Sequence, residues 1–189
     1  MRSVWLLAGM GLMFAAPAGT ADVGTGNPIA AVWKEQHLHF FYMGRTSRYS
    51  CDGLSDKVRA MLLELGARRD LRITALGCEQ PAALARLGSL GPSLDLVFSA
   101  PALPDATAKP RHPGDLGVVD ARFETFTITS DAFRNMGIAD CELVEAFAHQ
   151  ILSKLVTRDL KQDITCVPFQ ESGSRFIVRG EILRTLLPR

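Results

Sequence analysis

The sequence lacks the short motifs that mark the commonest functional sites. It has four cysteines, but no Cys-x-x-Cys pair, no Cys-x-x-Cys-His haem attachment and no Cys/His spacing typical of zinc. It has neither a phosphate-binding glycine loop nor a Gly-x-Ser-x-Gly nucleophile turn. With two Trp and two Tyr it gives no sign of an aromatic platform for sugars. No motif in the sequence therefore supports a redox, haem-binding, zinc-binding, nucleotide-binding or serine-hydrolase function. We expect no cofactor.

An excess of one charge is also lacking. Lys and Arg total 21 against 20 Asp and Glu, and removal of Arg2 with a leader would leave 20 of each. A neutral chain has no electrostatic attraction for nucleic acid or for an anionic membrane. We therefore expect neither as the partner.

Long hydrophobic runs are confined to the N-terminus. Arg2 precedes 11 residues (4–14) that are apolar apart from glycine, and small residues lead to Ala21. This is the layout of a secretory signal peptide over residues 1–21, and as a helix the run would span only about 17 Å. The alternative is a buried N-terminal helix. We expect an exported chain, periplasmic or secreted, with no membrane span after cleavage.

The remaining 168 residues contain one pattern twice, 90 positions apart. Residues 51–65 and 141–155 each begin with Cys. Counted from Leu54 and from Val144, further apolar residues follow at spacings 4, 7, 8 and 11, which predicts an amphipathic helix. Each helix is followed by Arg-Asp-Leu (69–71 and 158–160), a β-like run and a second Cys. The other strand candidates are residues 37–42, 94–98, 122–128 and 176–178.

These elements predict an α+β fold made of two strand-helix-strand-strand repeats. We expect ferredoxin-like repeats at residues 29–99 and 118–189, joined by a proline-rich linker loop at residues 100–117. The helices would pack on one face of a mixed or antiparallel sheet. Two separate halves and one merged sheet both satisfy the pattern.

The cysteine positions predict one disulfide in each repeat. In a strand-helix-strand unit, the start of the helix and the end of the second strand lie at the same end of the unit. Cys51 and Cys78 occupy these places in the first repeat, and Cys141 and Cys166 occupy them in the second. We therefore predict the bridges Cys51–Cys78 and Cys141–Cys166, each stabilising the fold by roughly 3 to 4 kcal/mol.

Capping residues support both helices. Ser50 or Asp52 can cap the first helix and Asp140 the second, because a side-chain oxygen there accepts a hydrogen bond from a free backbone N–H. Gly66 suits the end of the first helix.

The first candidate site is the loop of residues 44–50, which leads into the first helix. Gly44 and the polar side chains can bind a phosphate, sulfate or carboxylate, because helix N-termini and guanidinium groups both attract anions. The alternative is a capping loop with surface arginines. The ligand-binding candidates are Arg45, Thr46, Ser47, Arg48 and Ser50.

The second candidate site is a metal site at His37 and His39. Two residues apart on a strand, these imidazoles share a face with Met43, which suits a soft or borderline metal such as copper. The alternative is an ordinary strand surface. Asp95 lies on a predicted strand, where its carboxylate is either catalytic or the polar half of an alternating pattern. Residues 171–175 indicate a turn between the last two strands.

Two functions follow from these features. The first is a non-enzymatic exported binding or assembly module whose sheet face or edge meets another extracytoplasmic protein. The alternative is a small-anion ligand-binding protein or enzyme that uses the 44–50 loop. The identity of the partner and the oligomeric state stay open at this point.

Overall fold

The computed structural model describes residues 27–77, 92–104, 117–131, 133 and 136–186. Over these ranges the chain forms a six-stranded antiparallel sheet, two α-helices and two short 3₁₀ helices. The elements are β1 (Ile29–Phe41), α1 (Cys51–Glu64), β2 (Arg72–Leu76), β3 (Ser93–Ala102), β4 (Val118–Thr129), η1 (Ile138–Asp140), α3 (Cys141–Gln150), η2 (Leu152–Lys154), β5 (Thr157–Thr165) and β6 (Arg175–Thr185).

The strand order β2-β3-β1-β4-β6-β5 has the same arrangement in both halves of the chain. In the first half β3 lies between β1 and β2, and in the second half β6 lies between β4 and β5. Because β1 and β2 are both antiparallel to β3, they run parallel to each other, with α1 as the connection. The halves join where the first residues of β1 pair with the first residues of β4.

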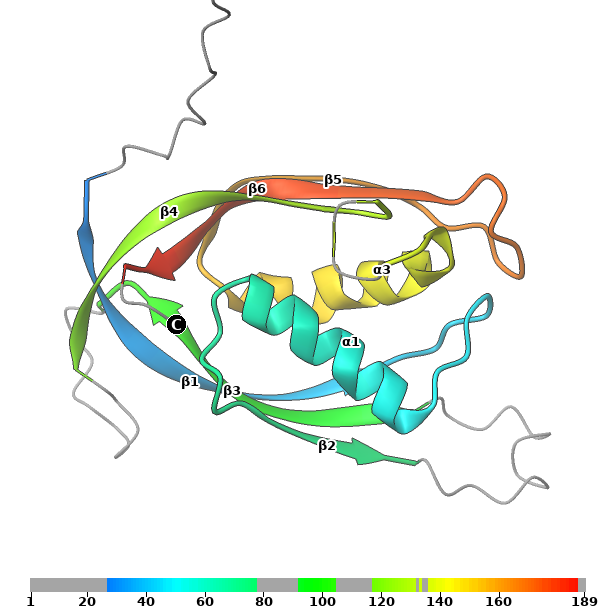
Figure 1. The fold of residues 1–189 in the computed structure, drawn as a ribbon, viewed down its shortest axis with the longest axis horizontal. Helices are drawn as coiled ribbons and strands as arrows, with labels where there is room; N and C mark the ends of the chain where they lie inside the picture. The colour runs from blue at the N-terminus through cyan, green and yellow to red at the C-terminus, as the bar shows by residue number, and fades with distance from the viewer. Residues whose placement is uncertain (1–26, 78–91, 105–116, 132, 134–135, 187–189) are drawn as a thin grey trace, which may run out of the picture.

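The sheet curls around the two helices. Figure 1 shows β1, β3 and β2 on one side and β4, β6 and β5 on the other, with α1 and α3 between them. Buried residues of both helices and both halves of the sheet form one continuous core, in which the largest include Phe40, Phe98 and Phe147. Both helices therefore lie on the concave face of a single merged sheet.

Helix α1 has the start and end that the sequence predicts. Its buried residues Leu54, Val58, Met61 and Leu62 form the predicted stripe. The Ser50 hydroxyl, not Asp52, accepts the capping hydrogen bond from the Gly53 N–H. The chain then leaves the helix through Gly66 at φ 95°, a left-handed conformation that glycine adopts without a steric cost.

The second helix is shorter than predicted. Helix α3 ends at Gln150, and the predicted continuation to Leu155 is wrong because the chain turns into η2 after Ile151. The Gln150 side chain binds both the N–H and the C=O of Phe41, at 2.9 and 2.7 Å. This pair of hydrogen bonds fastens the helix end to the end of β1. The apolar stripe continues across the break, since Leu152 and Leu155 are still buried.

Strand β5 is an edge strand with an irregularity. Arg158–Leu160, which the sequence places between the helix and the strand, lies inside β5, where the register with β6 shifts and Asp159 has φ 53°. A Cβ on Gly180 of β6 would lie 3.1 Å from the Arg158 carbonyl oxygen. The bulge therefore leaves little room for a side chain at this position. Such bulges and charged side chains protect a sheet edge from pairing with another strand.

The α+β class, the antiparallel sheet and one disulfide are confirmed. Cys141 at the start of α3 is bonded to Cys166, directly after β5. The Cys51–Cys78 bridge stays a prediction because Cys78 lies outside the described residues. The ferredoxin-like repeats also stay a prediction. The predicted signal peptide and most of the predicted linker also lie outside them, although β3 extends through residues 100–102. In the described residues no helix is long and apolar enough to cross a membrane.

Candidate functional site

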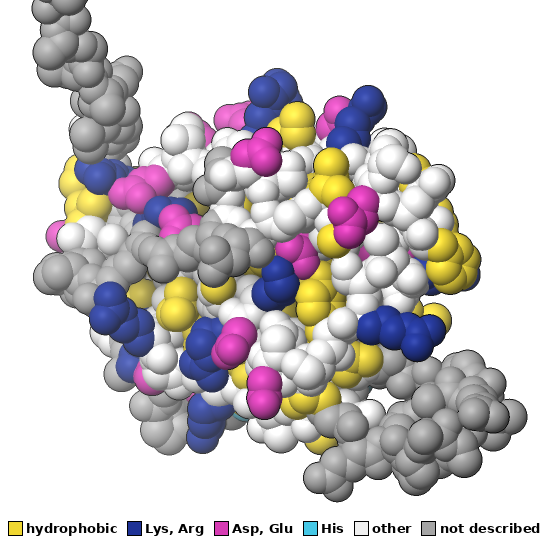
Figure 2. Space-filling view, turned by 45° about the vertical axis from the view of Figure 1, so that its right-hand side comes forward, with side chains coloured by type: hydrophobic (Ala, Val, Ile, Leu, Met, Phe, Trp, Pro, Cys, Tyr) yellow, Lys and Arg dark blue, Asp and Glu magenta, His cyan; other side chains and the backbone are white. Residues whose placement is uncertain are grey.

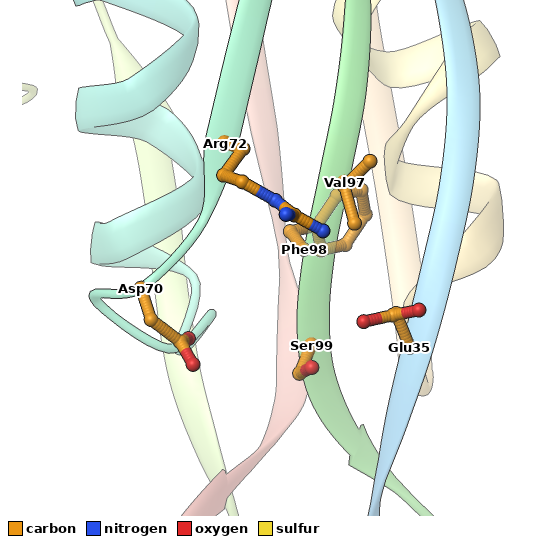
Figure 3. A pocket seen from close by; sticks show the side chains of 6 residues that line it. All are labelled: Glu35, Asp70, Arg72, Val97, Phe98 and Ser99. Carbon is orange, nitrogen blue, oxygen red and sulfur yellow. The ribbon is translucent and has the colours of Figure 1, made fainter. Parts of the chain in front are cut away.

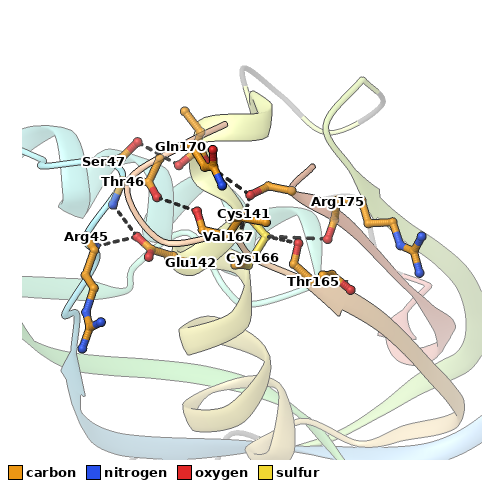
Figure 4. Close-up of a disulfide and its surroundings, with 12 residues drawn as sticks. Arg45, Thr46, Ser47, Cys141, Glu142, Thr165, Cys166, Val167, Gln170 and Arg175 are labelled. Atoms are coloured by element: carbon orange, nitrogen blue, oxygen red, sulfur yellow. Dashed lines mark hydrogen bonds between the residues drawn. A yellow bond between two sulfur atoms is a disulfide. The ribbon is translucent and has the colours of Figure 1, made fainter. Parts of the chain in front are cut away.

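Three loops meet at the end of the molecule where both helices begin. They are residues 42–50 after β1, residues 136–142 around η1, and residues 166–174 between β5 and β6. Figure 4 shows them gathered around the Cys141–Cys166 disulfide. We call this region the loop end. It contains all five ligand-binding candidates predicted from the sequence.

Gly44 is glycine for a packing reason. A Cβ at this position would lie 1.7 Å from the hydroxyl oxygen of Tyr42, whose side chain is buried. The Tyr42 hydroxyl in turn donates to the Ser47 carbonyl at 2.8 Å. The loop therefore closes over Tyr42, and this contact by itself accounts for the glycine that the sequence offered as part of an anion site.

The 44–50 loop binds a carboxylate of its own chain. The backbone N–H groups of Arg45 and Thr46 donate to Glu142 Oε2 at 2.6 and 2.8 Å. The Ser47 hydroxyl donates to the Ala139 carbonyl at 2.7 Å. These two N–H groups and the Ser47 hydroxyl thus already bind groups of the same chain. The side chains of Arg45 and Arg48 are exposed.

Asp140 is a buried carboxylate that links the two halves of the chain. It is 4% exposed and accepts hydrogen bonds from the Tyr49 hydroxyl, from Lys57 Nζ at 2.8 Å and from the Gly137 N–H at 2.7 Å. The prediction that Asp140 caps α3 is wrong, because its side chain makes no capping bond to that helix. The carboxylate instead turns toward the first half, where Tyr49 and Lys57 provide stronger, charge-assisted partners.

Both tyrosines of the chain lie beside this carboxylate. Their rings are 5.2 Å apart. Burial, followed by the negative charges of Glu142 and Asp140, raises the pKa of Tyr42 well above its usual range. Burial and the hydrogen bond to Asp140 do the same to the pKa of Tyr49. Both side chains therefore stay protonated at neutral pH, so they act as hydrogen-bond donors here and not as bases.

The disulfide closes a ring of contacts at the loop end. Cys141 is bonded to Cys166, and its neighbour Glu142 holds the backbone of Arg45 and Thr46. The Thr46 hydroxyl donates a hydrogen bond to the carbonyl of Val167, the residue after Cys166, at 3.4 Å (Figure 4). The position of the 44–50 loop is thus coupled to that of the 166–174 loop.

An exposed aromatic residue stands on the 166–174 loop. Phe169 is 76% exposed and has φ 66°, a left-handed conformation that bulky residues rarely adopt. The Arg45 guanidinium lies 6.0 Å from its ring centre. The buried Ser174 hydroxyl holds the loop by accepting from the Val167 N–H at 2.8 Å and donating to the Gln170 carbonyl. Sequence reasoning did not single out Phe169, since hydropathy alone does not distinguish it from a core residue.

The two histidines predicted as metal ligands lie on β1, before the 42–50 loop. His37 pairs with Glu35 at 2.8 Å and His39 pairs with Asp95 of β3 at 2.7 Å. Met43 is exposed. Among the residues that the structure describes, no three His, Cys, Asp or Glu side chains are close enough together to hold a metal ion. Each imidazole thus has a separate carboxylate partner.

A shallow pocket of about 240 Å³ lies near the other end of the first half. Figure 3 shows Arg72 of β2 reaching across β3, with Glu35 on β1 and Asp70 before β2 as the nearby acids. Val97, Phe98 and Ser99 complete the lining. The pocket is open to solvent and mixes one cation with two acids, so its charges do not select one class of ligand.

The surface around the loop end carries both signs of charge. In Figure 2 basic and acidic side chains are interspersed, with hydrophobic side chains exposed between them.

A comparison of the chain with protein-family models, with curated proteins and with solved structures found no match. No family, relative or structural neighbour therefore assigns a function to the loop end.

Proposed function

We propose that this chain is a non-enzymatic exported module that binds a protein partner at the loop end. Phe169 is the observation that supports this most strongly. An aromatic side chain in the left-handed region costs about 1 kcal/mol or more, and its exposure forgoes the stabilisation of burial. Strain of this kind persists where the surrounding structure holds it, and it is concentrated at functional sites.

The contacts around Phe169 suit recognition of a protein. Alanine scans of interfaces find that a few aromatic and arginine side chains carry most of the binding energy. Here an aromatic ring and a guanidinium lie together on two loops that are coupled through Glu142 and the disulfide. A surface that is already ordered loses less conformational entropy on binding.

The proposed compartment is consistent with the disulfide. Bridges of this kind form and persist in oxidising compartments, and an N-terminal leader over residues 1–21 would deliver the chain to one. N-terminal sequencing of the protein recovered from the periplasm or the medium tests this part. Recovery of the intact chain from the cytoplasm would contradict it.

We also propose that the two halves derive from one strand-helix-strand-strand unit. The repeated element order, the matching strand orders and a cysteine at the start of each helix support this. The same reasoning predicts the Cys51–Cys78 bridge, and no described cysteine is free. A non-reducing peptide map should contain both intra-repeat bridges, whereas a crossed pairing would contradict the duplicated plan.

Site-specific crosslinking tests the partner-binding function. A photoactivatable benzophenone side chain at Phe169 should give one discrete adduct in cells that make this protein. Val118 is the matched control, because it is 71% exposed and lies at the start of β4, at the opposite end of the molecule (Figure 1). With the partner purified, Phe169→Ala should weaken binding about 30-fold, as expected for a hot-spot residue. Equal adducts at both positions, or none at Phe169, would refute the proposal.

A small anion is the second candidate ligand, because the loop demonstrably accommodates a carboxylate. An external anion would have to displace Glu142 from the Arg45 and Thr46 N–H groups. Glu142→Gln removes the internal charge, so phosphate or sulfate should then raise the unfolding temperature more than in the parent protein. If Arg45→Ala with Arg48→Ala does not change any anion effect, this alternative is eliminated.

A further inference from the structure

The two arginines of the loop end have no ion-pair partner among the residues that the structure describes. Both of them, Arg45 and Arg48, are exposed. Five other arginines do form ion pairs: Arg68 with Asp70, Arg122 and Arg184 with Glu124, Arg158 with Glu181 and Arg175 with Asp163.

The carboxylate that binds the Arg45 backbone makes no ion pair with the Arg45 side chain. Glu142 directs one oxygen to two backbone N–H groups of the 44–50 loop. Figure 4 shows the Arg45 side chain pointing away from Glu142. The guanidinium faces the ring of Phe169 instead, at 6.0 Å. The exposed acid of the 166–174 loop is Glu171, two residues beyond Phe169, and it makes no ion pair with a described residue either.

We propose that the partner is a protein that receives Phe169 in an apolar pocket rimmed by carboxylates, which pair with Arg45 and Arg48. This deepens the proposed function and rests on it. Guanidinium groups form two parallel hydrogen bonds with carboxylates, and these pairs are strongest where the interface excludes water. An acidic rim therefore complements both exposed features of the loop end.

A lipid bilayer fits the loop end less well. Stable attachment to a membrane takes a long amphipathic face, a lipid chain or a cluster of four or more basic residues. The loop end offers two guanidiniums and single exposed apolar side chains such as Met43 and Phe169. Charge complementarity with a carboxylate-bearing protein surface is therefore the better explanation.

A random peptide library displayed on phage tests the proposal without a known partner. Selection uses the mature protein, and the Phe169→Ala variant removes peptides that bind elsewhere. We expect the enriched peptides to combine an apolar stretch with Asp or Glu. Their binding should fall about tenfold in Arg45→Ala with Arg48→Ala, should not fall in Glu171→Gln, and should weaken as salt is added. Thermal unfolding of each variant checks that it folds.

The outcomes separate this inference from the proposed function. Peptides that require Phe169 but are neutral or basic, and bind independently of both arginines, would overturn the acidic rim and leave the binding module standing. A failure to enrich any peptide that requires Phe169 would overturn both. If the protein binds vesicles of phosphatidylcholine and phosphatidylglycerol in equal amounts, and this binding requires Phe169, the partner is a membrane and not a protein. If the protein dimerises and the dimer requires Phe169, the partner is a second copy of this chain.

Discussion

Replacing Tyr49 with Phe should destabilise the fold through the buried carboxylate of Asp140. The substitution deletes one hydroxyl and keeps the ring that packs against Tyr42. Asp140 would be left with Lys57 Nζ and the Gly137 N–H as its described donors. Because Asp140 is 4% exposed, water can replace the lost donor only if the structure opens.

The expected magnitude follows from the charge on the acceptor. A hydrogen bond to a charged group contributes about 1.5 to 3 kcal/mol to the free energy of unfolding. For a domain of this size, such a loss lowers the unfolding temperature by about 3 to 12 °C. Tyr42→Phe is the matched control, since it removes a hydroxyl that donates to the neutral Ser47 carbonyl, at a cost of about 0.5 to 1.5 kcal/mol.

Urea unfolding of both variants, followed by near-ultraviolet circular dichroism, measures these losses. Asp140→Asn completes a double-mutant cycle, because Tyr49→Phe should cost much less once the carboxylate is an amide. The two substitutions should therefore be non-additive by about 0.5 kcal/mol or more. Additive losses, or a Tyr49→Phe variant no weaker than Tyr42→Phe, would show that Asp140 does not join the two halves as described.

Three further predictions follow from the same structure. The unfolded chain ionises its tyrosines near pH 10 while the folded chain keeps both protonated, so stability should hold below that pH and fall above it. Phenolate absorbance should then rise together with unfolding, and a separate titration near pH 10 in the folded protein would contradict this. Replacing Cys141 and Cys166 by Ala should lower the free energy of unfolding by about 3 to 4 kcal/mol in denaturant titrations, and no loss would show that the bridge is dispensable. Gly180→Ala should cost about 1 kcal/mol by crowding the β5 bulge, whereas Gly117→Ala, whose Cβ would meet nothing within 4 Å, should be neutral; equal effects would contradict the packing argument.

Patterns confined to one element were predictable from the sequence. The stripe of α1, its Ser50 cap and its end at Gly66 depend on residues within a few positions of one another, and the structure contains all three. The Cys141–Cys166 bridge was also predictable. In a strand-helix-strand unit, chain direction alone places the start of the helix and the end of the second strand at the same end of the unit, and the two cysteines occupy these positions. Chain direction thus predicted one contact of the second half, in addition to the local features of α1.

Contacts between distant segments were not predictable. Asp140 has the position of a helix cap in the sequence, but Tyr49 and Lys57, 91 and 83 residues away, take its carboxylate instead. The Gln150 amide at the end of α3 binds the backbone of Phe41, 109 residues earlier. In both cases the partner lies far away in the sequence, so the residues near Asp140 or Gln150 do not reveal it.

The sequence by itself determined the order of strands and helices, where α1 is capped, and which cysteines close the second half. The tertiary structure decided how the sheet curls around the helices, that the 44–50 loop binds Glu142, and that Phe169 stands exposed beside Arg45. Periodicity and capping act within one element, so they can be recognised in the linear sequence. The loop end depends on three segments that approach one another only when both halves pack onto one core, and no local pattern encodes that approach.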